Sequence, residues 1–206
     1  ICSQALKGVI EPKQNALLRD ALELDYLDAI GGLPRADRGR EQDHLDEILS
    51  LGKVYNKRVH VHVDQLNDNL EKETELLARR TMHWGMEGKV TAVHGISIAC
   101  HPKEYRREVY KMSRDAGLSF ISCPTAWIDS RREETLTPTH NAVTPAEEMI
   151  AHGLVVAIGS DNIHDVYKPY STGEMALELN SDTLVDIATK NGRLVIGMEE
   201  FKGGRE

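Results

Sequence analysis

The chain has 206 residues, of which 40% are hydrophobic and 28% are charged, and its formal net charge at pH 7 is -8. This composition is typical of a globular protein. The acidic balance offers no broad basic surface to a phosphate backbone, so we do not expect a nucleic-acid partner. The longest apolar runs, such as Leu154 to Ile158, fall far short of the roughly 20 residues that cross a bilayer, so we expect no membrane span.

Three cysteines, Cys2, Cys100 and Cys123, lie far apart and form no CxxC pattern. An odd number of widely spaced cysteines predicts neither a disulfide framework nor a thiolate zinc site. A reducing, cytoplasmic location is therefore the expectation. The chain opens on Ile1 without an initiating Met or signal-peptide pattern, which suggests that the sequence is truncated at its start.

Short β-rich runs alternate with stretches of helical periodicity along the chain. The predicted strands are Ile1 to Leu6, Leu27 to Ile30, Arg58 to Val63, Val90 to His94, Leu118 to Cys123 and Val155 to Ser160. The predicted helices are Asn15 to Leu24, His44 to Tyr55, Leu70 to Trp84, Pro102 to Ala116 and Pro145 to His152. Such alternation predicts an α/β fold with parallel strands joined by helical crossovers.

A doubly wound sheet and a barrel both fit this alternation, but the glycine-rich phosphate-binding patterns of many nucleotide-binding sheets are absent. We therefore favour a (β/α)8 TIM-type barrel. A full barrel needs about 250 residues and eight strands. We expect an incomplete barrel, about strands 3 to 8, whose fold continues upstream of Ile1.

Residues capable of chemistry lie at the carboxyl ends of three predicted strands: His62, Asp64 and Gln65, then His94, then Asp161 and Asn162. In a barrel these ends converge on the face where active sites are built. Imidazole and carboxylate groups are suitable ligands for zinc or ferrous iron. A histidine at a strand end is also commonly a structural residue, so the spacing alone leaves both readings open.

Several segments resemble the amidohydrolase superfamily, in particular its cytosine deaminase-like and N-isopropylammelide isopropylamidohydrolase-like members. The similar segments are "VHVDQLND" from Val61, "VTAVHG" from Val90 and "GSDNIHDVYKPYSTGEM" from Gly159, supported by "FISCP" from Phe120 and "DTLVDIATKNGRLVIGM" from Asp182. The resemblance runs through most of the chain. It implies that residues 1–206 form one catalytic barrel domain, with a gap near residues 175–182, where the chain is shorter than the family's helical stretch.

The resemblance also implies residue roles. His62 resembles a metal ligand, and Asp161 resembles the aspartate that binds metal and takes a proton from the attacking water. His94 resembles the histidine that polarises the substrate. Asn162 and Tyr167 fall where the family places pocket-lining residues. One divalent metal ion, zinc or iron, is implied as the cofactor.

The first departure from the family pattern is the His-x-His pair of the opening strand, which does not occur at the start of this chain. His60-Val61-His62 has the same spacing but matches the later strand, and reading it as the opening pair would spoil the match at His94. We therefore take His60 as a barrel-facing or packing residue.

The second departure is Gln65, which stands where cytosine deaminases carry a glutamate that shuttles protons. Glutamine cannot act as a general acid or base, which weakens the case for cytosine deamination itself. Asp64 or a residue from outside this chain could substitute for it, and the isopropylamidohydrolase relatives also lack this glutamate. We keep Gln65 and Asp64 as predicted substrate-binding residues.

The rim of the predicted site carries arginines at Arg35 to Arg40 and at Arg131-Arg132, and also Trp127. The arginines could hold an anionic group, although a solvated charged loop is the simpler reading. Trp127 could stack on a flat heterocycle or pack against a helix. We include Trp127 among the predicted substrate-binding residues.

The resulting prediction is a metal-dependent hydrolase that cleaves a C–N bond of a small N-heterocyclic or amide substrate, as a deaminase or amidohydrolase. A small molecule is the expected partner, and the resemblance also implies a homo-oligomer. The alternative is a catalytically incomplete barrel kept as a binding or assembly protein, motivated by Gln65 and the absent His-x-His pair. A Schiff-base lyase is set aside because only Lys7 lies near a strand end.

Overall fold

The computed structural model describes the chain except residues 25, 128–141, 167, 170, 175–190 and 199–206. Its six strands are β1 (Cys2–Gln4), β2 (Ala29–Gly32), β3 (Arg58–Val63), β4 (Val90–His94), β5 (Ser119–Ser122) and β6 (Val155–Ile158). They form one sheet in the order β1-β2-β3-β4-β5-β6, and every neighbouring pair is parallel. Strands that pair in sequence order and in parallel belong to a barrel rather than to a doubly wound sheet, so the predicted partial barrel is confirmed.

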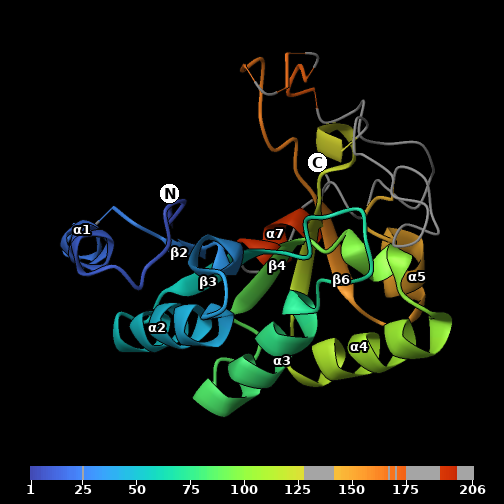
Figure 1. The fold of residues 1–206 in the computed structure, drawn as a ribbon, viewed down its shortest axis with the longest axis horizontal. Helices are drawn as coiled ribbons and strands as arrows, with labels where there is room; N and C mark the ends of the chain where they lie inside the picture. Colours follow the sequence, from blue (N-terminus) through green and yellow to red (C-terminus); the bar gives the residue numbers. More distant parts are fainter. Residues whose placement is uncertain (25, 128–141, 167, 170, 175–190, 199–206) are drawn as a thin grey trace, which may run out of the picture.

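Helices connect the strands in chain order. They are α1 (Pro12–Leu22), α2 (Glu41–Val54), α3 (Glu73–Trp84), α4 (Lys103–Asp115) and α5 (Ala146–Ala151), with a short α7 (Gly192–Val195). Three 3₁₀ turns, η1 (Pro34–Asp37), η2 (Ser97–Cys100) and η3 (Pro124–Trp127), follow β2, β4 and β5. In Figure 1 the helices α1 to α5 sweep around one side of the sheet in the order of the chain.

The core lies between the sheet and this layer of helices. Along β3, Val59, Val61 and Val63 are fully buried, whereas the residues between them are only partly buried. In α2 the buried residues include Leu45, Ile48, Leu49 and Leu51, the spacing of an apolar helix face. The two periodicities, two in the strand and about 3.6 in the helix, bring these apolar faces together.

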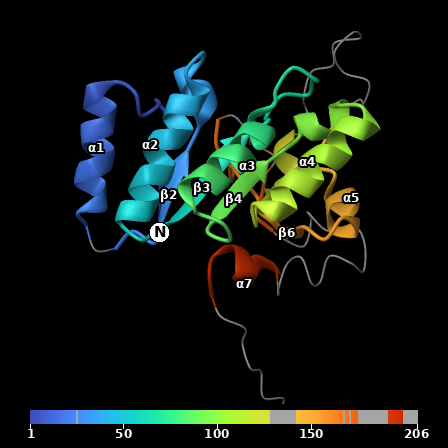
Figure 2. The ribbon, with the colours of Figure 1, turned by 90° about the horizontal axis from the view of Figure 1, so that it is seen from below.

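The short helix α7 lies away from this layer, at the amino ends of the strands (Figure 2). Asn191 donates a hydrogen bond from Nδ2 to the carbonyl of Val156 in β6 (2.9 Å). Gly197, just after α7, lies against the side chain of Arg58, the first residue of β3. The opposite, carboxyl ends of the strands carry the residues of interest.

The predicted strands and helices agree with the observed ones to within a few residues, and α3 shows the most informative difference. We predicted a helix from Leu70, but α3 begins at Glu73. The reason is tertiary: the cap of this helix comes from a side chain nine residues earlier. Among the described residues, no helix combines the length and the apolar character needed to cross a membrane.

Candidate active site at the carboxyl ends of the strands

Two histidines meet where β3 and β4 end. The register places Val63 opposite His94 and His62 opposite Val93. Nδ1 of His62 lies 3.1 Å from Nε2 of His94, and the ring centroids are 4.9 Å apart in an edge-on arrangement. One ring therefore donates a hydrogen bond to the other, and at least one of them is a neutral acceptor.

Burial keeps both imidazoles in the neutral form. Burial and, to a smaller extent, the neighbouring His62 together lower the pKa of His94 to about 3. Burial likewise lowers the pKa of His62, an effect partly opposed by the negative charge of Asp161. A neutral imidazole is the form that binds a metal ion.

Asp161 follows β6 and acts on the same histidine. Each of these two side chains shifts the pKa of the other, so they lie within range of an electrostatic interaction. Although the residue as a whole is exposed, partial desolvation of its carboxyl raises the pKa of Asp161, and the neighbouring His62 lowers it. The site thus combines two neutral imidazoles with one carboxyl group.

The backbone at this face adopts conformations that side chains rarely take. Asp64, His94 and Asp161 have φ angles of 50°, 76° and 57°, in the left-handed region. Such residues cost of order 1–3 kcal/mol each and cluster at functional sites. At His94 the strain is held in place by Thr144, whose hydroxyl donates to the His94 carbonyl from the segment before α5.

The Asp64 carboxylate is directed at the amino end of α3. Its Oδ1 accepts a hydrogen bond from the N–H of Glu73 (2.7 Å), and its Oδ2 accepts one from the N–H of Thr74 (3.2 Å). Its own N–H donates to Oε2 of Glu73 (3.1 Å). Asp64 is therefore a helix cap, and contact with substrate stays a prediction.

The other predicted substrate-binding residues are placed unevenly. Gln65 is partly buried, and its Nε2 has no hydrogen-bond partner among the described residues. Asn162 donates from Nδ2 to Asp165, which also accepts from the N–H of Lys168 (2.7 Å), so this pair shapes the loop after β6. Trp127 ends η3.

Tyr167, the arginines Arg131 and Arg132, and the stretch 175–182 lie outside the described residues. The arginines of the other rim segment face acidic neighbours. Arg40 Nε lies 2.8 Å from Asp43, and Arg35 lies 4.0 Å from Glu71. These pairs fit the simpler reading of that segment as a charged surface loop.

His60 lies two residues before His62 in β3, and its side chain is partly buried. Its Nε2 is buried without a partner in the described part of the chain. Burial, with smaller contributions from the neighbouring Arg58 and His62, lowers its pKa to about 4. The position of His60, on the same side of β3 as His62, agrees with the prediction of a barrel-facing residue.

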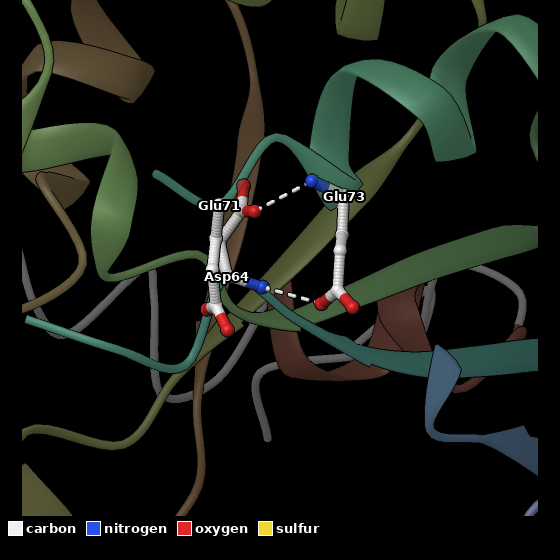
Figure 3. A group of neighbouring side chains, drawn as sticks. All are labelled: Asp64, Glu71 and Glu73. Carbon is white, nitrogen blue, oxygen red and sulfur yellow. Dashed lines mark hydrogen bonds between the residues drawn. The ribbon is translucent and has the colours of Figure 1, made fainter. Parts of the chain in front are cut away.

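Sequence reasoning missed an acidic cluster beside this site. Asp64, Glu71 and Glu73 bring one carboxylate oxygen each to within 4.8 Å of one another. Figure 3 shows these three side chains as neighbours. The signal in the sequence was a pair of acidic residues, Glu71 and Glu73, near the start of a helix, which the sequence analysis did not consider. Backbone N–H groups occupy both oxygens of Asp64, so the histidine pair with Asp161 is the donor set that better fits zinc or iron.

The model of the amidohydrolase family matches residues 12–203. A Haemophilus influenzae protein described as uncharacterized is 49% identical over 151 residues, which are 72% of this chain and 54% of that protein. The N-isopropylammelide isopropyl amidohydrolase of Pseudomonas sp. is 24% identical over 208 residues, covering 94% of this chain and 48% of that enzyme. The chain thus spans about half the length of the relatives it matches.

Two solved structures share the fold. The 5-methylcytosine deaminase from Klebsiella pneumoniae superposes with a TM-score of 0.84 at 25% identity, covering 95% of this chain and 52% of that one. The N-isopropylammelide isopropylaminohydrolase from Burkholderia multivorans gives a TM-score of 0.76 at 21% identity, covering 97% and 51%. The family match over most of the sequence and this partial barrel lead to one conclusion: the chain belongs to the amidohydrolase family.

Proposed function

We propose that this chain forms the larger part of the catalytic barrel of a metal-dependent hydrolase that cleaves a C–N bond through a metal-activated water. The observation that carries the proposal is the meeting of His62 and His94 at the carboxyl ends of adjacent strands, with Asp161 acting on His62 from β6. We assign residues 1–206 to one domain, because all six strands belong to one sheet.

The substrate class follows from the names of the relatives. They include an N-isopropylammelide isopropyl amidohydrolase, a pterin deaminase and a 5-methylcytosine deaminase. These names share a planar N-heterocycle with an exocyclic nitrogen. We propose the same class of small molecule here.

The metal would be held by His62 and Asp161, with the remaining ligands supplied from outside the described residues. When bound, a divalent ion would lower the pKa of its water to about 7, which provides hydroxide at neutral pH. Whether the ion is zinc or iron is a question for metal analysis, because both accept this donor set.

The protein's own residues then have separate tasks. Asp161 orients the attacking water and holds its proton, and the raised pKa of its carboxyl favours that transfer. His94 is neutral, so it can donate one N–H to the heteroatom on which charge develops. The proton held by Asp161 passes to the leaving nitrogen.

Gln65 sets a limit on the chemistry. It can hold a substrate carbonyl or ring nitrogen by hydrogen bonding, but it cannot shuttle a proton. Its Nε2, buried and without a partner among the described residues, is available as such a donor. This favours hydrolysis in which Asp161 alone moves the proton between water and the leaving nitrogen.

The test uses the full-length protein, purified and analysed for bound metal, with release of ammonia or amine measured on a panel of aminated and alkylaminated pyrimidines, triazines and pterins. We expect about one metal ion per chain and release from at least one compound. His83→Ala, an exposed histidine at the end of α3, is the matched control and should leave both readouts unchanged.

A metal-free protein that stays inactive after zinc or ferrous iron is supplied would overturn the proposal. It would favour the second reading, a catalytically incomplete barrel that binds or assembles. Size-exclusion chromatography on the same sample tests the expected homo-oligomer.

A further inference from the structure

The turn at Asp64, where the chain leaves β3 on its way to α3, is next to the candidate site in the sequence. His62 lies two residues before Asp64, and Gln65 is the residue after Asp64. Asp64 takes a left-handed backbone conformation with φ 50°, which turns the chain sharply at the end of β3. Whatever holds this turn also decides where the two flanking side chains point.

Asp64 is held through every polar group it has. Its carboxylate accepts from the N–H groups of Glu73 and Thr74, and its carbonyl accepts from the N–H groups of Ile96 (2.8 Å) and Ser97 (3.0 Å) after β4. Its remaining group, the N–H, donates to the side chain of Glu73. In the described part of the chain, Glu73 is thus the side chain that binds the backbone N–H of Asp64.

The bonds between Asp64 and Glu73 are reciprocal, as Figure 3 shows. Each residue accepts from the other's N–H with its carboxyl group. The same pattern occurs in a capping box, in which two side chains each accept a hydrogen bond from the other residue's N–H. In a capping box the two residues are three positions apart, whereas Asp64 and Glu73 are nine positions apart. It ties the strand end to the helix start across the intervening loop.

We propose that Glu73 is a positioning residue of the site, which fixes the Asp64 turn and thereby the directions of His62 and Gln65. That Glu73 holds the turn is argued from the hydrogen bonds alone. The effect of Glu73 on turnover rests on the proposed function. Glu73 itself is nine-tenths buried, and its carboxyl group is bonded to the Asp64 backbone.

The charge state of Glu73 supports this role. Burial raises the pKa of Glu73 to about 8, and the carboxylates of Asp64 and Glu71 add to the effect. At neutral pH the side chain is therefore a neutral acid, which can accept from the Asp64 N–H without adding a third negative charge to the cluster. Ionisation of Glu73 would place a negative charge next to the carboxylates of Asp64 and Glu71, and the repulsion would weaken the bonds that hold the turn.

Several titratable groups from other elements lie near the cluster. They are Glu41 at the start of α2, Arg35 in η1, Asp68 and Lys72 in the connecting loop, and Tyr105 of α4, whose pKa is raised in part by the charge of Asp64. A surface pocket of about 470 Å³ opens beside Glu71 and Glu73, with Arg35 and Arg38 on its rim.

Hydrogen exchange of the full-length protein tests whether Glu73 holds the turn, without any assay of activity. Glu73→Ala should speed exchange at the Asp64 amide by about tenfold, the order expected for one lost hydrogen bond, while Val61 in mid-strand changes much less. Glu73→Gln keeps an acceptor oxygen of the same shape and should exchange like the wild type. Equal acceleration at Asp64 and Val61, or none at Asp64, would overturn the proposal.

The pH dependence of unfolding gives a second readout. In the unfolded chain Glu73 titrates near 4.5, and in the folded protein near 8, so folding takes up a proton between these values. Stability therefore falls as pH rises through this window, by up to about tenfold in the unfolding constant per pH unit, and levels off above it. Glu73→Gln should flatten this slope, and an unchanged slope would contradict the neutral acid.

Turnover, once a substrate is found, completes the test. Wild-type kcat should fall above pH about 8, whereas Glu73→Gln should keep its activity there. Glu73→Ala should lower kcat across the range with metal content retained. If no compound is turned over, the proposed function fails, while the exchange and unfolding readouts still decide the role of Glu73.

Discussion

The two sides of strand β3 differ in burial and in the hydrogen-bond partners of their side chains. On the side of the helices, Val59, Val61 and Val63 are fully buried against an apolar layer. On the other side, His60 and His62 are only partly buried, and Nε2 of His60 has no partner among the described residues. The valine side forms part of the packed core, and the histidine side presents polar atoms that can bind a ligand.

The comparison shows how one strand separates stability from chemistry. Because successive side chains point to opposite sides, a change on one side of β3 leaves the other side's contacts largely intact. Valines are suited to the packed side, since β-branched residues fit a pleated, buried surface. The variants below test whether the two sides behave independently.

The largest effect is expected from the polar side. His62→Ala and Asp161→Asn in the full-length protein should each lower turnover by at least about 10³-fold, and His62→Ala should also lower metal content. Kinetics and plasma mass spectrometry on the same preparations give both values. Unfolding midpoints close to the wild type would show that packing is untouched, whereas retained turnover in either variant would remove that residue from the site.

The strand end should respond with a loss of stability. Asp64→Ala removes two hydrogen bonds to the start of α3, and we expect it to lower the free energy of unfolding by about 2 to 3 kcal/mol. Asp64→Gly loses the same bonds but tolerates the left-handed backbone, so it should cost about 1 kcal/mol less. Urea denaturation measures both, and equal values would mean that the backbone at Asp64 stores no strain.

A smaller effect is expected on the packed side. Val61→Ala removes two buried methyl groups, which should cost about 1.5 to 2 kcal/mol. Metal content should stay at the wild-type level. Metal loss in this variant would show that the two sides of β3 are coupled.

The smallest effect is expected at His60. Replacement by Ala loses some packing but also removes a polar atom buried without a partner in the described structure, so stability should change by less than about 1 kcal/mol. Metal content should be unchanged. Metal loss equal to that of His62→Ala would show that His60 is itself a ligand and that the strand register is misassigned.

Much of the fold could be predicted from local patterns. All six strands and the helices α1 to α5 were predicted from periodicity, because apolar residues at spacing two or about 3.6 mark the buried side of each element. The absence of a glycine-rich phosphate loop favoured a barrel, and the sequential parallel order of the strands confirms it. The short turns η1, η2 and η3 were not predicted, since 3₁₀ turns carry no such period.

The candidate site could be predicted in part. His62, His94 and Asp161 were singled out because they end predicted strands, and the structure brings the two imidazoles within 3.1 Å. The roles of Asp64 and Glu73 could not be read from the sequence. A cap nine residues from its helix has no local signature, whereas a cap at the usual place does.

The sequence by itself determined which residues face the core and which strand ends carry polar groups, because these properties depend on spacing along the chain. Only the tertiary structure decided that the Asp64 carboxylate caps α3, that Glu73 binds the Asp64 backbone, and that the two histidines touch. These contacts join residues from separate elements. Their geometry depends on strand register and on the left-handed turn after β3, which a one-dimensional pattern does not encode.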